Sequence, residues 1–145
     1  LAYFHLAKIL NNPSEYDQAY RNYETALEID PELSECHYWF AKLLSGGEKL
    51  KTDGSLITEP EIPRAKEHLE KALKINKKYS KAYYKLGLLL VGESKFKDAM
   101  KNFEYAIAND SNFAEAHYQI ALLLMDDAVN KILRTSSTKK AKSKN

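Results

Sequence analysis

The chain has 145 residues, a length typical of one structural domain, and its 22 basic and 20 acidic residues nearly balance. Four lysines near the C-terminus, Lys139, Lys140, Lys142 and Lys144, supply the basic excess. Without them the chain has 18 basic and 20 acidic residues, and this net charge of −2 over the rest of the chain argues against nucleic-acid binding there. The single cysteine excludes an internal disulfide, and no apolar run approaches the roughly 18–20 residues that cross a bilayer, so we expect a cytoplasmic protein, with nuclear or cytoskeletal locations left open.

Two helices are predicted at the start of the chain, over residues 1–11 and 15–29. The sequence Asn12-Pro13-Ser14 separates them, and Pro31 ends the second helix because a residue before proline is disfavoured in the helical conformation. The chain begins inside the first helix, so we expect it to be a fragment of a longer protein.

The second predicted pair consists of a helix from Ser34 to about Leu44 and a helix from Pro63 to Asn76. Residues 45–63 lie between them and hold three of the five glycines and two of the four prolines. This segment carries 12 residues more than the corresponding turn elsewhere in the chain. We expect residues 46–60 to be the least ordered internal segment, with at most transient helix, and leave open whether the insertion has a function.

Residues 80–113 form the third predicted pair, and residues 114–133 read as one long helix that closes the structure with a polar outer face. The last residues, 135–145, have no apolar periodicity and are predicted to be disordered. A serine directly before three of the helices is a predicted N-cap: Ser14, Ser34 and Ser80.

A spacing of 34 residues relates these pairs. Each first helix repeats the pattern of Tyr83, Leu86, Gly87 and Leu90, spaced i, i+3, i+4, i+7, and each second helix carries two alanines seven residues apart. Small residues at these points allow two helices to cross closely, so we expect all of them to be buried. They are Ala7, Ala19, Ala26, Ala41, Ala65, Ala72, Gly87, Ala99 and Ala106.

A 34-residue helix-turn-helix period with small residues at these positions resembles the tetratricopeptide repeat. The resemblance covers residues 1 to about 125 and implies an all-α, right-handed solenoid of antiparallel helix pairs. Its units would span residues 1–33, 34–79 with the insertion, and 80–113, followed by a capping helix over 114–134. The fold implies binding of other proteins without naming them, because it hosts many unrelated roles.

Catalysis and metal binding find little support in the sequence. His37 and His117 occupy the repeat position of Tyr3 and Tyr83, so they are predicted to pack between helices, and no histidine pair has the i, i+4 spacing of metal ligands. Cys36 has no evident base partner and its register points inward. We therefore predict no enzyme, no metal site and no cofactor.

The functional hypothesis rests on an aromatic residue one step beyond that repeat position in all four units. Stacked helix pairs form a concave face lined mainly by the first helices, and the register turns these aromatic rings and nearby lysines toward it. The alternative is that the tyrosines pack against a neighbouring unit with the hydroxyl in water. The predicted partner-binding residues are Phe4, Lys8, Tyr38, Trp39, Lys42, Lys81, Tyr84, Lys85, Leu88, Tyr118 and Gln119.

One subfamily of the resembling proteins binds the carboxylate end of chaperones on this face. Lys81 and Lys85 resemble the last two basic residues of that clamp, while its asparagines and its first lysine are missing, with Tyr38, Lys42 and Tyr84 in or near their places. We predict a scaffold that binds a protein or peptide in the concave groove. RNA binding by helical repeats and an architectural role inside a multi-subunit complex are the alternatives.

Overall fold

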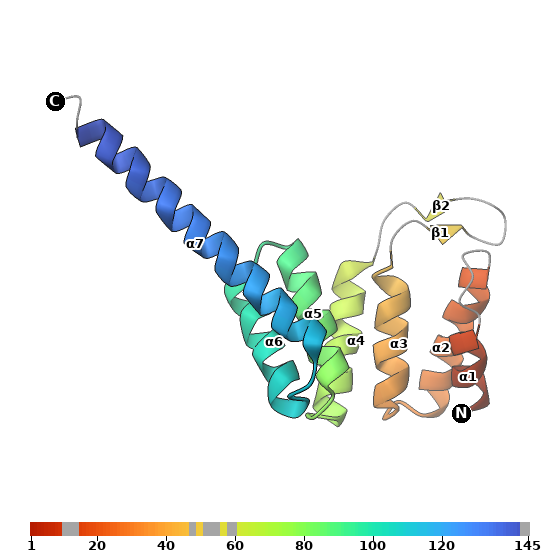
Figure 1. The fold of residues 1–145 in the computed structure, drawn as a ribbon. Coiled ribbons are helices and arrows are strands. Elements are labelled where there is room, and N and C mark those ends of the chain that lie inside the picture. The colour runs from red at the N-terminus through yellow and green to blue at the C-terminus, as the bar shows by residue number, and fades with distance from the viewer. Residues whose placement is uncertain (10–14, 47–48, 51–55, 58–60, 143–145) are drawn as a thin grey trace.

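The structure is a computed structural model, which describes residues 1–9, 15–46, 49–50, 56–57 and 61–142 (Figure 1). Helices form almost all of this part of the chain. In chain order they are α1 (Ala2–Ile9), α2 (Tyr16–Ile29), α3 (Ser34–Leu44), α4 (Ile62–Ile75), α5 (Ser80–Gly92), α6 (Phe96–Asn109) and α7 (Ala114–Lys142), and two short strands, β1 (Lys49–Leu50) and β2 (Leu56–Ile57), stand between α3 and α4.

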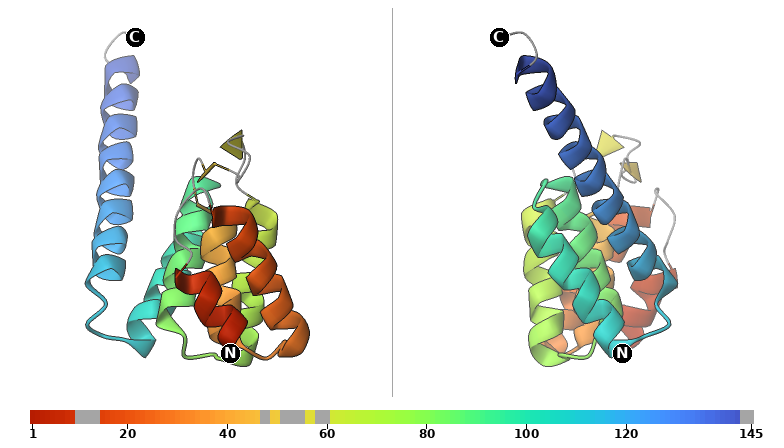
Figure 2. Two further views of the ribbon diagram at one scale, coloured as in Figure 1. Left: turned by 90° about the vertical axis from the view of Figure 1, so that its right-hand side faces the viewer. Right: turned by 60° about the vertical axis from the view of Figure 1, so that its left-hand side comes forward.

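The helices stack as three hairpin pairs, α1 with α2, α3 with α4, and α5 with α6, and α7 follows against α6 (Figures 1 and 2). Successive pairs meet through α2 and α3 and through α4 and α5. The predicted all-α solenoid of antiparallel helix pairs is therefore confirmed. Pro63 lies in the first turn of α4, as predicted, where its missing N–H removes no intrahelical hydrogen bond.

Small residues hold the helices of each pair close together. All nine predicted positions are buried, and Ala65, Ala72, Ala99 and Ala106 have no exposed surface. Gly87 shows why size matters, because a Cβ atom there would lie 2.5 Å from Cε1 of Phe103. The Phe103 ring fills the space that a side chain at position 87 would need, so the glycine serves the packing of α5 on α6.

Aromatic rings join the first pair to the second. The Tyr23 ring of α2 stacks on the fully buried Phe40 ring of α3 with 5.5 Å between centroids, and Tyr20 meets Phe40 edge-on at 5.1 Å. Such ring pairs contribute about 0.5–1.5 kcal/mol beyond their buried area. The stack is thus continuous across the α2–α3 boundary.

The turns after the second helices use a device that differs from the predicted serine caps. Leu33 and Tyr79 occupy the N-cap positions of α3 and α5 without a side-chain cap, and Ser34 and Ser80 lie inside the helices. Ser14 lies outside the described residues. Instead, a carboxylate or amide oxygen accepts a hydrogen bond from the backbone N–H two residues on, at the same repeat position each time. The acceptors are Asp30, Asn76 and Asp110.

The described part of the insertion contains a strand pair where loop or transient helix was predicted. β1 and β2 pair antiparallel, with Lys49 opposite Ile57 and Leu50 opposite Leu56. The sequence between them includes Asp-Gly, a dipeptide typical of tight hairpins, which was the overlooked signal. At the base of the insertion the Glu61 N–H donates to the Leu44 carbonyl at 3.0 Å. The predicted disorder of the remaining insertion concerns residues outside the described part.

The last helix, α7, is longer and less covered than predicted. Residues 135–142, predicted to be disordered, continue its backbone, while residues 143–145 lie outside the described part. Lysine and alanine are good helix formers, and extending a helix is far easier than starting one. The predicted polar outer face is wrong, because Tyr118, Met125 and Val129 are 61%, 56% and 48% exposed. The C-terminal half of α7 projects beyond the stack of helix pairs (Figures 1 and 2). No helix in the described part of the chain has the length and apolar character to cross a membrane.

Candidate functional site

A groove of about 760 Å³ is lined by residues of α1, α3 and α5, of the turns that precede α5 and α7, and of the first turn of α7. Both signs of charge are present, since four lysines and three carboxylate side chains surround the aromatic side chains of the groove. The residues that line it, and that define the groove from here on, are Lys8, Ser34, Glu35, Tyr38, Trp39, Lys42, Asn76, Lys78, Tyr79, Ser80, Lys81, Tyr84, Asp110, Phe113 and Glu115.

Six of the predicted partner-binding residues line this groove, and five do not. The six are Lys8, Tyr38, Trp39, Lys42, Lys81 and Tyr84. Lys85 lies on the same helix as Tyr84 and is half-buried, Leu88 packs against the hydrophobic core, and Tyr118 and Gln119 lie on α7. The prediction that Phe4 lies on the groove surface is wrong, since its side chain is 2% exposed and packs against Tyr23. Without a hydroxyl group that must reach water, the phenylalanine ring turns fully inward.

The Trp39 ring contacts two lysines and one glutamate in the groove. The Lys8 Nζ lies 4.8 Å and the Lys42 Nζ 4.6 Å from the centroid of the indole ring, distances at which a cation is attracted to an aromatic face. The indole Nε1–H donates to Oε1 of Glu35 at 3.3 Å, and Lys8 pairs with the same oxygen at 3.4 Å. These contacts fix the ring at the mouth of the groove while leaving it partly exposed.

The tyrosines of the groove are shared between the groove and the core. Tyr38 packs on Tyr79 with 5.1 Å between ring centroids, and burial raises the pKa of both phenols. The centroid of the Tyr84 ring lies 4.9 Å from that of Phe113 and 5.7 Å from that of Phe103. The alternative considered from the sequence, packing against a neighbouring unit, thus describes one side of each ring, and the groove takes the other side.

The lysines give the groove an uncompensated positive region. Burial lowers the pKa of the Lys85 ammonium, and the nearby Lys42 lowers it further. Among the described residues no carboxylate lies within ion-pair distance of Lys42 or Lys85. Lys42, whose ammonium group lies 4.6 Å from the centroid of the Trp39 ring, favours a ligand that brings negative charge next to an apolar or aromatic group, and Lys85 adds to the positive potential although it does not line the groove.

Residues of the turns complete the groove, and the sequence reasoning overlooked them. Tyr79 and Phe113 line it, and they occupy the same repeat position, 34 residues apart. Their repeat partner is Leu33. The signal that could have found them was the 34-residue spacing itself, applied to the turn as well as to the helices.

A second cluster, behind α3, contains two histidines. The Nδ1 atoms of His37 and His68 lie 2.8 Å apart, and Nε2 of His37 lies 3.0 Å from the Pro31 carbonyl. Because a carbonyl only accepts, the proton of His37 is on Nε2, so its Nδ1 accepts from Nδ1–H of His68. Burial lowers the pKa of both rings, that of His68 to about 4. The described residues contain no group of three His, Cys, Asp or Glu side chains that could hold a metal.

The packing predicted for this repeat position is confirmed for His37, which is 5% exposed, and wrong at the two ends of the stack. Tyr3 is 45% exposed, and His117 is exposed with its Nε2–H directed at the Ser111 carbonyl. Both lack a neighbouring helix pair on one side, since they belong to the first and last helices of the described stack.

Comparisons with known proteins agree with this fold. The family described as RMD1-3, regulator of microtubule dynamics protein 1-3, matches residues 3–90. Similar solved structures include the first TPR of Spaghetti (RPAP3) bound to the HSP90 peptide SRMEEVD, with 18% identity, a TM-score of 0.71, and coverage of 88% of this chain and 91% of that chain. A mutant O-GlcNAc transferase from Thermobaculum terrenum gives 18% identity, a TM-score of 0.67, and coverage of 85% and 21%. Comparison with curated proteins gave no match. The fold is therefore that of tetratricopeptide repeats.

Proposed function

Because the chain belongs to the family of regulator of microtubule dynamics proteins 1-3, we propose that it is a protein-interaction module whose groove binds an extended segment of a partner. The observation that carries the proposal is Trp39, whose partly exposed ring is approached by two lysine ammonium groups at the groove mouth. Aromatic anchors flanked by cations are the residues that dominate peptide and protein interfaces.

The chemistry of the groove selects the kind of segment. The Lys42 ammonium group, which lines the groove, favours a carboxylate, Lys85 near it adds to the positive potential, and the aromatic side chains of the groove favour an apolar anchor. Glu35, Asp110 and Glu115, which also line the groove, disfavour a uniformly acidic chain. A segment with an apolar or aromatic side chain flanked by one or two acidic residues fits both features. The HSP90 peptide bound by the RPAP3 repeat domain, SRMEEVD, is a segment of this general kind.

Binding rather than catalysis is proposed because the nucleophile and base candidates are engaged elsewhere. The Cys36 side chain is fully buried, and burial raises the pKa of its thiol to about 12, so a reactive thiolate does not form near neutral pH. His37 and His68 bond to each other, and neither lines the groove.

Selection from a displayed peptide library tests the proposal, and the chain supplies its own sensor. Trp39 is the only tryptophan, so its fluorescence reports directly on a ligand that enters the groove. We expect selected peptides to be acidic with an apolar anchor, to shift this fluorescence, and to bind more weakly as salt is added. Lys42→Gln should weaken binding about tenfold.

The matched control is Lys101→Gln, which removes the same charge from an exposed site on α6, outside the groove. Equal weakening by both substitutions, or selected peptides that leave the tryptophan signal unchanged, would contradict binding in the groove. Since the family description names microtubule dynamics, assembled microtubules are the first macromolecular partner to test, by co-sedimentation of wild type and the same two variants.

A further inference from the structure

The last helix lacks a partner that the other first helices have. Within the described residues α1, α3 and α5 each pair with a following antiparallel helix, whereas the main contact of α7 is with the helix before it, α6. The side that faces the core is formed by Ala116, Ile120 and Leu123, of which Ala116 is fully buried and the other two are partly buried. The opposite side of α7 has no partner among the described residues.

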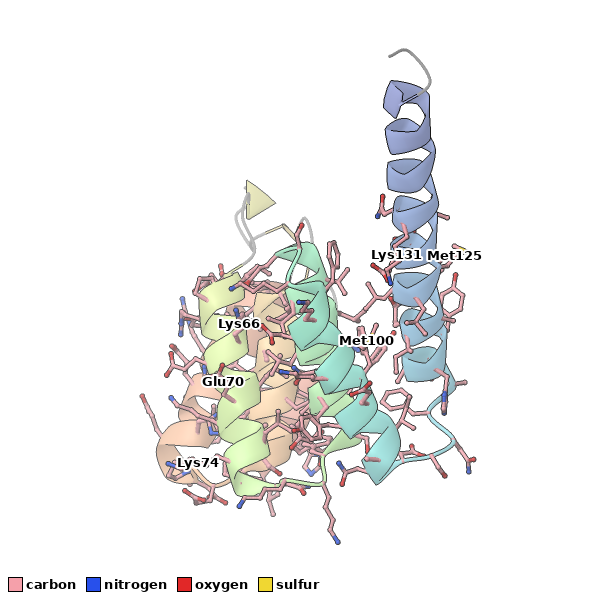
Figure 3. The ribbon with its side chains drawn as sticks, turned by 90° about the vertical axis from the view of Figure 1, so that its left-hand side faces the viewer. Lys66, Glu70, Lys74, Met100, Met125 and Lys131 are labelled. Carbon is pink, nitrogen blue, oxygen red and sulfur yellow. The ribbon has the colours of Figure 1, made fainter. Side chains whose placement is uncertain are left out.

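That opposite side carries an apolar seam. Tyr118, Leu122, Met125 and Val129 are spaced four, three and four residues apart, the alternation that places side chains along the contact line of two paired helices. At 100° per residue the seam lies on the far side of α7 from Ala116. Leu122 is partly exposed and the other three are about half exposed or more, and Met125 points away from the stack in Figure 3. We refer to these four residues as the α7 seam.

Two small residues border the α7 seam on one side. Ala121 and Ala128 are exposed, seven residues apart, and next to the seam on the helical surface. Small side chains beside a heptad seam allow two helix backbones to approach closely. This face therefore has the size pattern of a helix–helix contact as well as its apolar character.

The charge pattern of α7 selects the occupant. All acidic residues of the helix lie in its first half, at Glu115, Asp126 and Asp127, and no Lys or Arg precedes position 131. All its Lys and Arg residues lie in the second half, at Lys131, Arg134, Lys139, Lys140 and Lys142. A helix with opposite charges in its two halves is complementary to a second copy of itself in the antiparallel direction, and opposed in the parallel direction.

We propose that two copies of the chain associate through their α7 seams as an antiparallel helix pair. In this arrangement the second half of one α7 covers the outer face of the first half of the other. Each α7 then has the antiparallel neighbour that α1, α3 and α5 have within the chain. The second half of α7 projects beyond the stack of helix pairs (Figure 2). The proposal is independent of the groove and of its ligand.

The length of the contact sets the expected strength. α7 has 29 residues, about 43 Å of helix, of which the α7 seam occupies less than half. The apolar part of the contact is therefore short compared with the interfaces of permanent dimers, which bury about 2,000 Å² or more. We therefore expect a reversible dimer whose population rises with protein concentration.

Sedimentation equilibrium on the whole chain over a wide concentration range tests the proposal. We expect a monomer–dimer equilibrium in wild type and a monomer in Met125→Glu, because a carboxylate in the seam would be buried against apolar side chains. Leu124→Glu is the matched control, since Leu124 is 55% exposed against 56% for Met125 but lies off the seam. A wild type that is monomeric at all concentrations, or a control that dissociates like Met125→Glu, overturns the proposal. Circular dichroism of both variants confirms that they remain folded.

The direction of pairing needs a separate measurement. With Met125 opposite Val129, residue 115 of one copy lies opposite residue 139 of the other, so the two copies of residue 115 are about 36 Å apart along the helix axis. In a parallel pair the same residues lie about 10 Å apart. Spin labels on Glu115→Cys distinguish the two by their dipolar distance, and the short distance overturns the antiparallel assignment.

Discussion

His37 and His68 form a histidine–histidine hydrogen bond between α3 and α4, with their Nδ1 atoms 2.8 Å apart. The bond works only while at least one of the two facing nitrogens is unprotonated. The Pro31 carbonyl holds the proton of His37 on Nε2, so a proton added to His37 falls on the nitrogen that now accepts from His68. The pair is therefore stable as two neutral rings.

The first prediction is that acid weakens the fold through this pair. The folded pKa of His68, about 4, lies below its ordinary value of 6.5, and that of His37 is also lowered, so the unfolded chain binds more protons between these values. The stabilisation is complete above about pH 6.5 and decreases as the pH falls toward about 4. Lys71 and Arg64 on α4 add to this effect, and Glu67 opposes it.

Urea unfolding at several pH values measures this dependence. Glu32, in the turn before α3, also opposes the lowering of the His37 pKa. The variants described next leave these charged residues around the pair unchanged. We expect His68→Gln to flatten the loss of stability with acid, since the amide can still donate to His37 but does not titrate. His117→Gln, at an exposed position, should retain the wild-type slope. Equal slopes in wild type and His68→Gln would show that the pair does not control acid stability.

The second prediction concerns Gly87. Replacing it with alanine places a Cβ atom within 3.0 Å of three atoms of the Phe103 ring, so the ring must move inside the fully packed α5–α6 interface. We expect Gly87→Ala to lower the free energy of unfolding by about 1–3 kcal/mol, in spite of the better helix propensity of alanine.

Gly92 provides the control for this change. It lies at the end of α5, and a Cβ there meets no atom within 4 Å. Gly92→Ala should therefore leave the thermal midpoint unchanged or raise it slightly. Thermal melts of the two variants give opposite directions if the close approach of α5 and α6 depends on the missing side chain at position 87.

The third prediction separates the two roles of the groove aromatics. Tyr84 packs against Phe103 and Phe113, so Tyr84→Ala should lower the free energy of unfolding by about 1–3 kcal/mol. Trp39 contacts Tyr38 and the lysines at the groove mouth, so Trp39→Ala should cost less than about 1 kcal/mol while removing the anchor for a ligand. Chemical unfolding of both variants ranks these costs, and the reverse order would place Trp39 among the structural residues.

The fourth prediction is that the single thiol is protected in the folded protein. Cys36 is fully buried on α3, its Sγ lies 3.9 Å from the Tyr23 carbonyl, and burial raises the pKa of the thiol. A thiol reagent at about pH 8 should react with it only after urea is added. Rapid reaction without denaturant would mean that the contact between α2 and α3 opens readily.

The sequence predicted the regular part of the fold and failed where the regularity ends. Spacing alone located the helix pairs, and all nine small residues that it placed at their crossings are buried, because packing depends on size and register. Phe4 was misplaced because its repeat partners are tyrosines, which keep a hydroxyl in water, whereas the phenylalanine ring turns inward. His117 is exposed for another reason, since a repeat position predicts burial only when a following helix supplies the other half of the contact.

The same limit applies to the groove. Its helix-borne lining, such as Tyr38 and Lys42, followed from the repeat, but a repeat specifies position and not charge, so the positions of Asn76 and Lys81 hold the carboxylates Asp110 and Glu115 one unit later. These negative charges were therefore overlooked, although they restrict the ligands that the positive region can accept. A periodic pattern describes a row of positions well and its ends poorly.

The hydrogen bond from Glu61 N–H to the Leu44 carbonyl has a practical consequence. It joins the two ends of the insertion directly at the α3–α4 pair, so the helices are connected as if by a tight turn, whatever number of residues lies between positions 45 and 60. Changing the length of a closed loop costs only about 0.6 kcal/mol per doubling. This position is therefore where a reporter domain can be inserted into the chain, or the chain opened to create new termini, while the stack and its groove keep their geometry.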